Sequence, residues 1–469
     1  MALLRTVVLP STLAAVVGLA SAAESSGGEP SDSPAAVTTL SVADVGSLPS
    51  DDALRSILAG GTRSPAVGGT GALHLRGFDY RPGTFAIGGG GAGGGFTPQF
   101  RVGASLQFRY TASFRDDDEL PAADGEGFSH GFQRPRTRLI FDADITENLG
   151  AYISYNLSSL SSGAPSGETE GDLEEAYAVA GFGDNFYIRF GQFKVGHLYE
   201  ELIPDEYQAF AERSIATEYM GQQFSEGIQF GYATDEFSFT AAAHDGFGTW
   251  ETSFDSGDEA DIAWSFRGDW SPVGSLTQFQ DFTSFRGSDY GVRIGAGLTY
   301  ARLGETGAGS SGVPVQDEQD RFDWTADVQA KGDGWNAFAA YSGMTIDTED
   351  PFLDDITSHA FSVQGGYFLT EQVEFIARYE ALFPDEDAVA TDDNDFSFLT
   401  LGANYYVLPQ SHAAKFTCDI IYAFDETMPL SMLSNNNGVR PVGDGALNGV
   451  LGQTDDGEIT LRAQFQILF

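Results

Sequence analysis

The chain has 469 residues, 42% of them hydrophobic, and a formal net charge of −44, which would repel nucleic-acid phosphates and excludes nucleic acid as a partner. No segment beyond the N-terminal twenty residues approaches ~20 uninterrupted apolar residues, so membrane-spanning helices are excluded. The single cysteine, Cys418, excludes an intrachain disulfide.

The N-terminus predicts an exported protein. Residues 1–22 are expected to be a signal peptide, with a positive n-region at Arg5, an apolar stretch from Val7 to Leu19, and a small-residue cleavage site. Its apolar stretch is too short to span a bilayer. Residues 23–99 are rich in Ser, Gly and Pro, which predicts a low-complexity, largely disordered periplasmic extension.

From residue 100 onward, segments of about ten residues alternate between apolar and polar side chains, which is the length of a tilted membrane strand. The last one, Glu458 to Phe469, alternates strictly and ends on an aromatic residue. Sixteen segments are predicted: 100–111, 136–145, 149–158, 173–182, 185–193, 226–233, 236–244, 261–270, 290–300, 322–332, 334–343, 358–369, 372–382, 397–408, 413–424 and 457–469. Alternation with an even strand number predicts an all-β fold, a 16-stranded antiparallel transmembrane β-barrel over residues 100–469.

The connections alternate in length, with short turns after even-numbered strands and long loops after odd-numbered ones, as expected for periplasmic and external sides. The long loops carry 41 of the 68 acidic residues and seven basic ones. They are 112–135, 158–172, 194–226, 245–260, 301–321, 343–357, 383–396 and 425–456. One segment does not fit: 271–289 has nineteen residues where a short turn is expected. Either that turn is elaborated or a strand is miscounted.

The region from Leu173 to Tyr232 carries a recognisable set of motifs. They are LEEAYAVAG, YIRFGQFKVGHLYEEL, AFAERS and SEGIQFGY, preceded by RPRTRLIFDADI at 134–145. Together with the aromatic C-terminus, this pattern resembles the phosphate-selective porin O and P family over about residues 100–469. The resemblance implies a sixteen-stranded porin of the bacterial outer membrane, typically a homotrimer, with its third long loop folded into the pore.

Loop 194–226 is therefore the candidate constriction. Its candidate residues are Lys194, Glu200, Glu201, Glu212 and Arg213. Phosphate-selective members of the family rely on lysines clustered near the constriction, whereas this loop has one lysine and one arginine against seven acids. The resemblance does not carry phosphate specificity to this chain.

By parity, many basic side chains of the barrel wall face the lumen. The candidate pore-lining residues are Arg101, Arg109, Arg136, Arg138, Arg189, Arg293, Arg378 and Arg462. Because the last strand must pair with the first, several of them form a basic wall over three neighbouring strands. The acids of loop 194–226 could pair with this wall, and lumen acids could face it: Asp323, Asp327, Glu374 and Glu380. Alternatively, these arginines only neutralise neighbouring carboxylates such as Asp142, Asp144 and Glu458.

The expected function is passive diffusion through a water-filled channel. The solutes are ions and small polar molecules, with anions such as phosphate among the candidates, and the other expected contact is outer-membrane lipid. The six histidines are scattered, and no zinc-protease, Cys-x-x-Cys or Gly-x-Ser-x-Gly motif occurs, so neither an enzyme nor a cofactor or metal is expected. The alternative is a surface-binding or adhesin-type barrel whose long acidic loops are the functional part.

Overall fold

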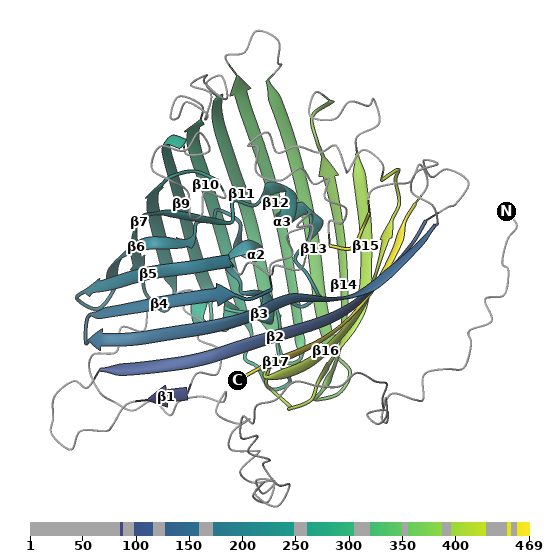
Figure 1. Ribbon diagram of the computed structural model, residues 1–469, viewed down its shortest axis with the longest axis horizontal. Coiled ribbons are helices and arrows are strands. Elements are labelled where there is room, and N and C mark those ends of the chain that lie inside the picture. Colours follow the sequence, from purple (N-terminus) through teal and green to yellow (C-terminus); the bar gives the residue numbers. More distant parts are fainter. Residues whose placement is uncertain are drawn as a thin grey trace, which may run out of the picture. The chain divides into compact units, whose positions relative to one another are not determined.

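The alternating segments form one closed antiparallel sheet in the computed structural model (Figure 1). The structure describes residues 85–87, 98–115, 127–158, 172–247, 260–303, 319–348, 355–386, 395–427, 448–451 and 457–469. The predicted signal peptide, nearly all of the predicted extension and much of the acidic external loops lie outside these residues.

Sixteen strands make the barrel, and each corresponds to one segment predicted from alternation, so the predicted fold is confirmed. They are β2 (Gln99–Phe114), β3 (Phe128–Thr146), β4 (Leu149–Asn156), β5 (Asp172–Phe182), β6 (Phe186–Lys194), β7 (Phe224–Ala233), β8 (Phe237–His244), β9 (Ala260–Val273), β10 (Gly291–Leu303), β11 (Gln319–Gly332), β12 (Trp335–Thr348), β13 (Ile356–Phe368), β14 (Val373–Phe383), β15 (Phe396–Tyr406), β16 (Ala414–Ala423) and β17 (Ile459–Leu468). Each pairs with its neighbours in chain order, and β17 pairs with β2 to close the ring.

The C-terminal aromatic residue takes part in this closure. The Phe469 N–H donates to the carbonyl of Ala104 at 3.0 Å, and the Ala104 N–H donates back at 2.6 Å. A further short strand, β1 (Phe85–Ile87), pairs with β2 between Phe100 and Val102, beyond the point where β17 ends. The Phe469 end of the barrel is the end with the short turns, which is the periplasmic rim.

Alternation sorts the side chains onto two faces. On β17, Ile459 points outward and is 41% exposed, whereas Arg462 points inward and is 0% exposed. Cys418 is exposed on the outer face of β16. Inward polar side chains of an open water-filled ring would be solvent-exposed. Their burial therefore shows that something fills much of the lumen.

The helical segments described lie in two connections. α2 (Tyr199–Leu202), η3 (Asp205–Tyr207) and α3 (Ile215–Met220) belong to the loop between β6 and β7, and η4 (Leu276–Phe279) belongs to the turn between β9 and β10. Among the described residues, no helix is long and apolar enough to cross a membrane.

The strands of the barrel differ in length. β4 and β8 have eight residues each, and β5, β6 and β7 have eleven, nine and ten. The strands from β9 to β13 have thirteen or fourteen. A tilted strand needs about 9–11 residues to cross the hydrocarbon, so β4 and β8 fall short of that length.

Candidate functional site

The loop between β6 and β7, residues 195–223, lies inside the barrel, and Figure 1 shows α2 and α3 within the ring of strands. Its hydrogen bonds to the far wall include Ala211 N–H to Asp419 Oδ2 (3.0 Å), Ala216 N–H to Glu380 Oε2 (3.0 Å) and Tyr219 Oη–H to Ser358 Oγ (3.1 Å). The structure therefore places this loop where the family resemblance implied.

Three of the predicted loop residues hold the loop together. Arg213 donates to the carbonyls of Glu200 (3.2 Å) and Ile203 (2.7 Å). Glu200 accepts from the N–H and the hydroxyl of Ser214 (2.9 and 2.6 Å), at the start of α3. Glu201 accepts from two main-chain N–H groups at the end of the loop (3.1 and 2.5 Å). These side chains are buried within the loop and are absent from the lining of the cavity described below, so their observed role is to shape the loop.

The basic wall of β2 and β3 is the surface on which the loop docks. Glu212 pairs with Arg109 (2.5 Å) and Arg136 (2.8 Å), and Asp205 pairs with Arg138 (2.6 Å). Burial opposes ionisation of Glu212, yet the guanidinium groups of Arg109 and Arg136 hold the pKa of that carboxyl below its usual range. The loop acids thus meet the wall arginines directly.

The remaining predicted arginines are not gathered into one column. Most neutralise nearby carboxylates: Arg101 with Asp142 (2.8 Å) and Asp144, Arg293 with Asp269 and Asp327 (2.5 Å each), Arg378 with Glu380 (3.2 Å), and Arg462 with Asp419 (2.7 Å). Two of the acids expected to face the wall, Asp327 and Glu380, are thus paired with nearby arginines. Glu374 accepts from Asn404 (3.0 Å) and from the Tyr406 hydroxyl (2.8 Å). The fourth, Asp323, pairs with Arg321 (2.8 Å). The structure therefore shows these lumen acids in local pairs and hydrogen bonds, not facing the basic wall across open space.

The segment 274–290, which does not fit the predicted turn lengths, is an elaborated turn that also enters the lumen. Phe279 and Phe282 are fully buried. The Tyr199 hydroxyl of the loop donates to the Phe279 carbonyl, and the Phe282 N–H donates to the Tyr207 carbonyl at 3.1 Å. Loop and turn therefore meet inside the barrel, one from each end.

Turn 274–290 is also bound by Lys331 of strand β11. The Lys331 ammonium donates to the carbonyls of Gln278 (2.8 Å) and Thr283 (2.9 Å) and pairs with Asp281. Burial works against the charge on Asp281, but Lys331 lowers the pKa of this carboxyl to about 2. Sequence reasoning missed this role. The available signal was three phenylalanines, at 279, 282 and 285, in a turn expected to be short and polar.

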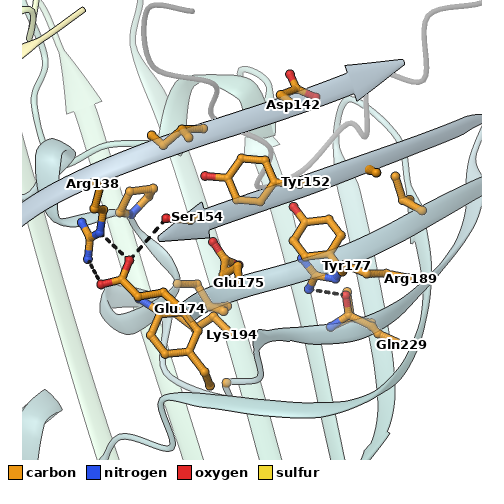
Figure 2. Close-up of a pocket in the computed structure, with 18 of the residues that line it drawn as sticks. Arg138, Asp142, Tyr152, Ser154, Glu174, Glu175, Tyr177, Arg189, Lys194 and Gln229 are labelled. Atoms are coloured by element: carbon orange, nitrogen blue, oxygen red, sulfur yellow. Dashed lines mark hydrogen bonds and ion pairs between the residues drawn. The ribbon is translucent and has the colours of Figure 1, made fainter. Parts of the chain in front are cut away.

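A cavity of about 120 Å³ remains between the loop and the wall formed by β3 to β8 (Figure 2). Its lining carries both signs of charge and several tyrosines. The residues that face it include Arg138, Tyr152, Glu174, Glu175, Tyr177, Arg189, Lys194 and Gln229. Of the predicted site residues, Arg138, Arg189 and Lys194 reach this cavity. Glu174 and Glu175 were not predicted, because parity alone places only one of two consecutive strand residues inward.

The motifs, the sixteen strands and the inserted loop agree with a comparison of whole sequences. The sequence model described as phosphate-selective porin O and P matches residues 106–422, from β2 to β16. The chain belongs to this family. It is accordingly an outer-membrane porin of the bacterial envelope that supports passive diffusion, and family membership favours a channel over an enzyme.

Several solved structures are similar to this porin. In-vitro folded OmpT of Vibrio cholerae has a TM-score of 0.49 at 14% identity, covering 79% of this chain and 98% of its own. OprB of Pseudomonas putida has 0.49 at 11% identity, covering 79% and 94%. OmpF of Salmonella typhi, in complex with daunomycin, has 0.48 at 10% identity, covering 79% and 98%. No curated protein sequence matches the chain.

The packing of the turn predicts that Phe279→Ala combined with Phe282→Ala increases single-channel conductance. Each buried Phe-to-Ala change costs about 3–5 kcal/mol, which weakens the docking of the turn on the loop and unblocks that side of the lumen. Phe237→Ala, an outward-facing residue near the same rim, is the control and should leave conductance unchanged. Equal conductance of wild type and double variant in planar bilayers would contradict the blocking role.

A second prediction concerns pH and His197, which is fully buried at the base of the loop, with Nδ1 2.7 Å from Gln222 Nε2. Burial, with Arg321 and Arg267, lowers the pKa of His197 to about 4 from 6.5. Between pH 6.5 and 4, a released loop therefore binds a proton that the inserted loop does not. The free energy that favours the inserted loop over the released loop therefore decreases by up to about 3 kcal/mol as pH falls through this window.

Current recordings across this pH range should consequently show more frequent loop-release events in acid. His197→Asn removes the titrating group and keeps an acceptor for Gln222. The frequency of loop-release events in this variant should therefore depend less on pH. The same pH response in both proteins would show that other groups control the loop.

Proposed function

We propose that this porin passes ions and small polar solutes along an off-centre path between loop 195–223 and the wall formed by β3 to β8. The observation that carries the proposal is the cavity on this side. In the described part of the chain, the loop and turn 274–290 bury the inward side chains of the opposite wall, including Arg378 and Arg462.

The charges around the cavity support weak ion selectivity. The lining contains four basic residues, Arg138, Arg189, Lys194 and Arg267, and five acids, Asp142, Glu174, Glu175, Asp205 and Glu206. Selectivity in a narrow pore follows the charge lining it. A phosphate ion would meet carboxylates next to every cluster of bases, so we propose general diffusion without tight phosphate binding.

Planar-bilayer recordings under a salt gradient test this proposal. The wild type should conduct, with cation and anion permeabilities close to each other. Arg189→Gln should shift the reversal potential towards cations, because it removes a positive charge from the path. Arg302→Gln is the matched control, since Arg302 pairs with Asp320 (2.9 Å) and is 44% exposed away from the cavity. Absence of any channel would favour the adhesin-type alternative, and block by micromolar phosphate would contradict weak selectivity.

We further propose that the porin is a homotrimer that associates through the wall of β4 to β8. β4 and β8 are the shortest strands of the barrel, and contact with a partner subunit would cover the part of this wall that they leave too short to span the hydrocarbon. Their outward residues are often small: Ala151, Ala176, Ala178, Ala180, Ala241 and Ala243. Small side chains allow two barrel walls to approach closely.

Ala178→Trp should therefore dissociate the trimer, because a bulky ring would separate the walls. Ala339→Trp is the matched control on the outer face of β12, opposite Val363 of β13, and should leave the assembly intact. Mass measurement in mild detergent gives the result. Trimers that persist in the first variant, or that are lost in the second, would place the interface elsewhere.

A further inference from the structure

A β-bulge in β5 directs two consecutive carboxylates into the cavity. Ser154 of β4 faces Glu175, whereas the next residue, Tyr155, faces Leu173, so Glu174 is an extra residue on β5. Bulges re-aim side chains and are enriched next to functional sites. Here the bulge brings Glu174 and Glu175 together in the cavity lining, where regular alternation would turn one of them outward.

The two carboxylates have different partners. Glu174 is bound by Arg138, at 2.5 Å and 2.9 Å. Glu175 forms no ion pair within 4 Å among the described residues, and neither does Lys194, which also lines the cavity. The Lys194 ammonium lies 4.9 Å from the centre of the Phe224 ring. The Glu175 carboxylate accepts a hydrogen bond from the Lys194 main-chain N–H, so its remaining acceptor sites and the Lys194 ammonium are the groups that a solute can pair with.

The neighbouring side chains complete a site with two poles. Figure 2 shows Glu175 and Lys194 in the middle of the lining, with Tyr152 beside Glu175 and Arg189 on the side of Gln229. Arg189 donates to Gln229 at 2.7 Å and lies over the Tyr177 ring at 4.8 Å. The basic pole is thus Lys194 with Arg189, and the acidic pole is Glu175.

The size of the cavity limits the solute. A dry cavity of about 150 Å³ accommodates benzene, so about 120 Å³ suits a compact molecule with few heavy atoms. A simple anion would also meet Glu174 and Glu175, and a simple cation would also meet Lys194 and Arg189. A compact molecule with both charges finds complementary partners at each end.

We propose that this cavity favours small zwitterions of the α-amino acid class, with the solute carboxylate at Lys194 and Arg189 and its ammonium group at Glu175. This inference rests on the proposed diffusion path. Favoured passage requires only that the two poles hold a zwitterion better than an uncharged molecule of the same size. Both poles stay partly hydrated, so the expected preference is about two- to fivefold.

Liposome-swelling rates with the full-length porin test it, with L-alanine as the zwitterion, lactamide as its uncharged isostere and lactate as the anion. Wild type should admit alanine faster than lactamide or lactate. Glu175→Gln and Lys194→Gln should each bring the alanine-to-lactamide ratio close to one. The charge swap Glu175→Lys with Lys194→Glu should restore part of the preference, because it keeps one charge of each sign. Arg302→Gln should behave as wild type.

Two negative results have different meanings. A wild-type alanine-to-lactamide ratio of one, or an unchanged ratio in both single variants, overturns the zwitterion site while swelling with lactamide still demonstrates a diffusion channel. No swelling with any solute overturns the diffusion path itself. Migration of unheated samples on SDS gels establishes that each variant is folded before its ratio is compared.

Discussion

The hydrocarbon interior of a membrane offers no hydrogen-bond partner to a peptide group, and the rest of this structure depends on that constraint. Every strand must be paired on both sides, so β17 has to meet β2. The pairing extends to the last residue, where Phe469 and Ala104 exchange two hydrogen bonds. Closure also encloses a lumen, and the alternation along each strand places polar and charged side chains in it.

Those inward charges account for the filled lumen. A buried guanidinium group is destabilising unless carboxylates and carbonyls surround it. Arg109, Arg136 and Arg138 find such partners on loop 195–223, whereas Arg462 finds Asp419 on the neighbouring strand. These pairs add little net stability over apolar packing, but breaking one leaves an unpaired buried charge. They therefore specify where the loop sits more than they strengthen the barrel.

Loop and turn together fill one side of the lumen and, in the described part of the chain, leave a cavity against β3 to β8. They meet through Tyr199, Phe279 and Phe282, and this contact packs against Phe338 of β12 and Ile376 of β14. The unfilled space lies against β3 to β8, where acids and bases are mixed. The same wall thus combines the features that support a solute path on its inner face and a subunit contact on its outer face.

Alternation and turn length were sufficient to predict all sixteen strands, because a period of two and the demand for closure are local properties that lipid imposes on each strand. The motifs around Leu173 to Leu202 indicated the inserted loop through resemblance. Parity also identified which arginines face inward, but it could not tell which of them the loop covers. The role of turn 274–290 and the bulge at Glu174 were decided only in the tertiary structure. Both depend on contacts between segments far apart in the chain, and a strand pattern records the face of a side chain but not what lies opposite it.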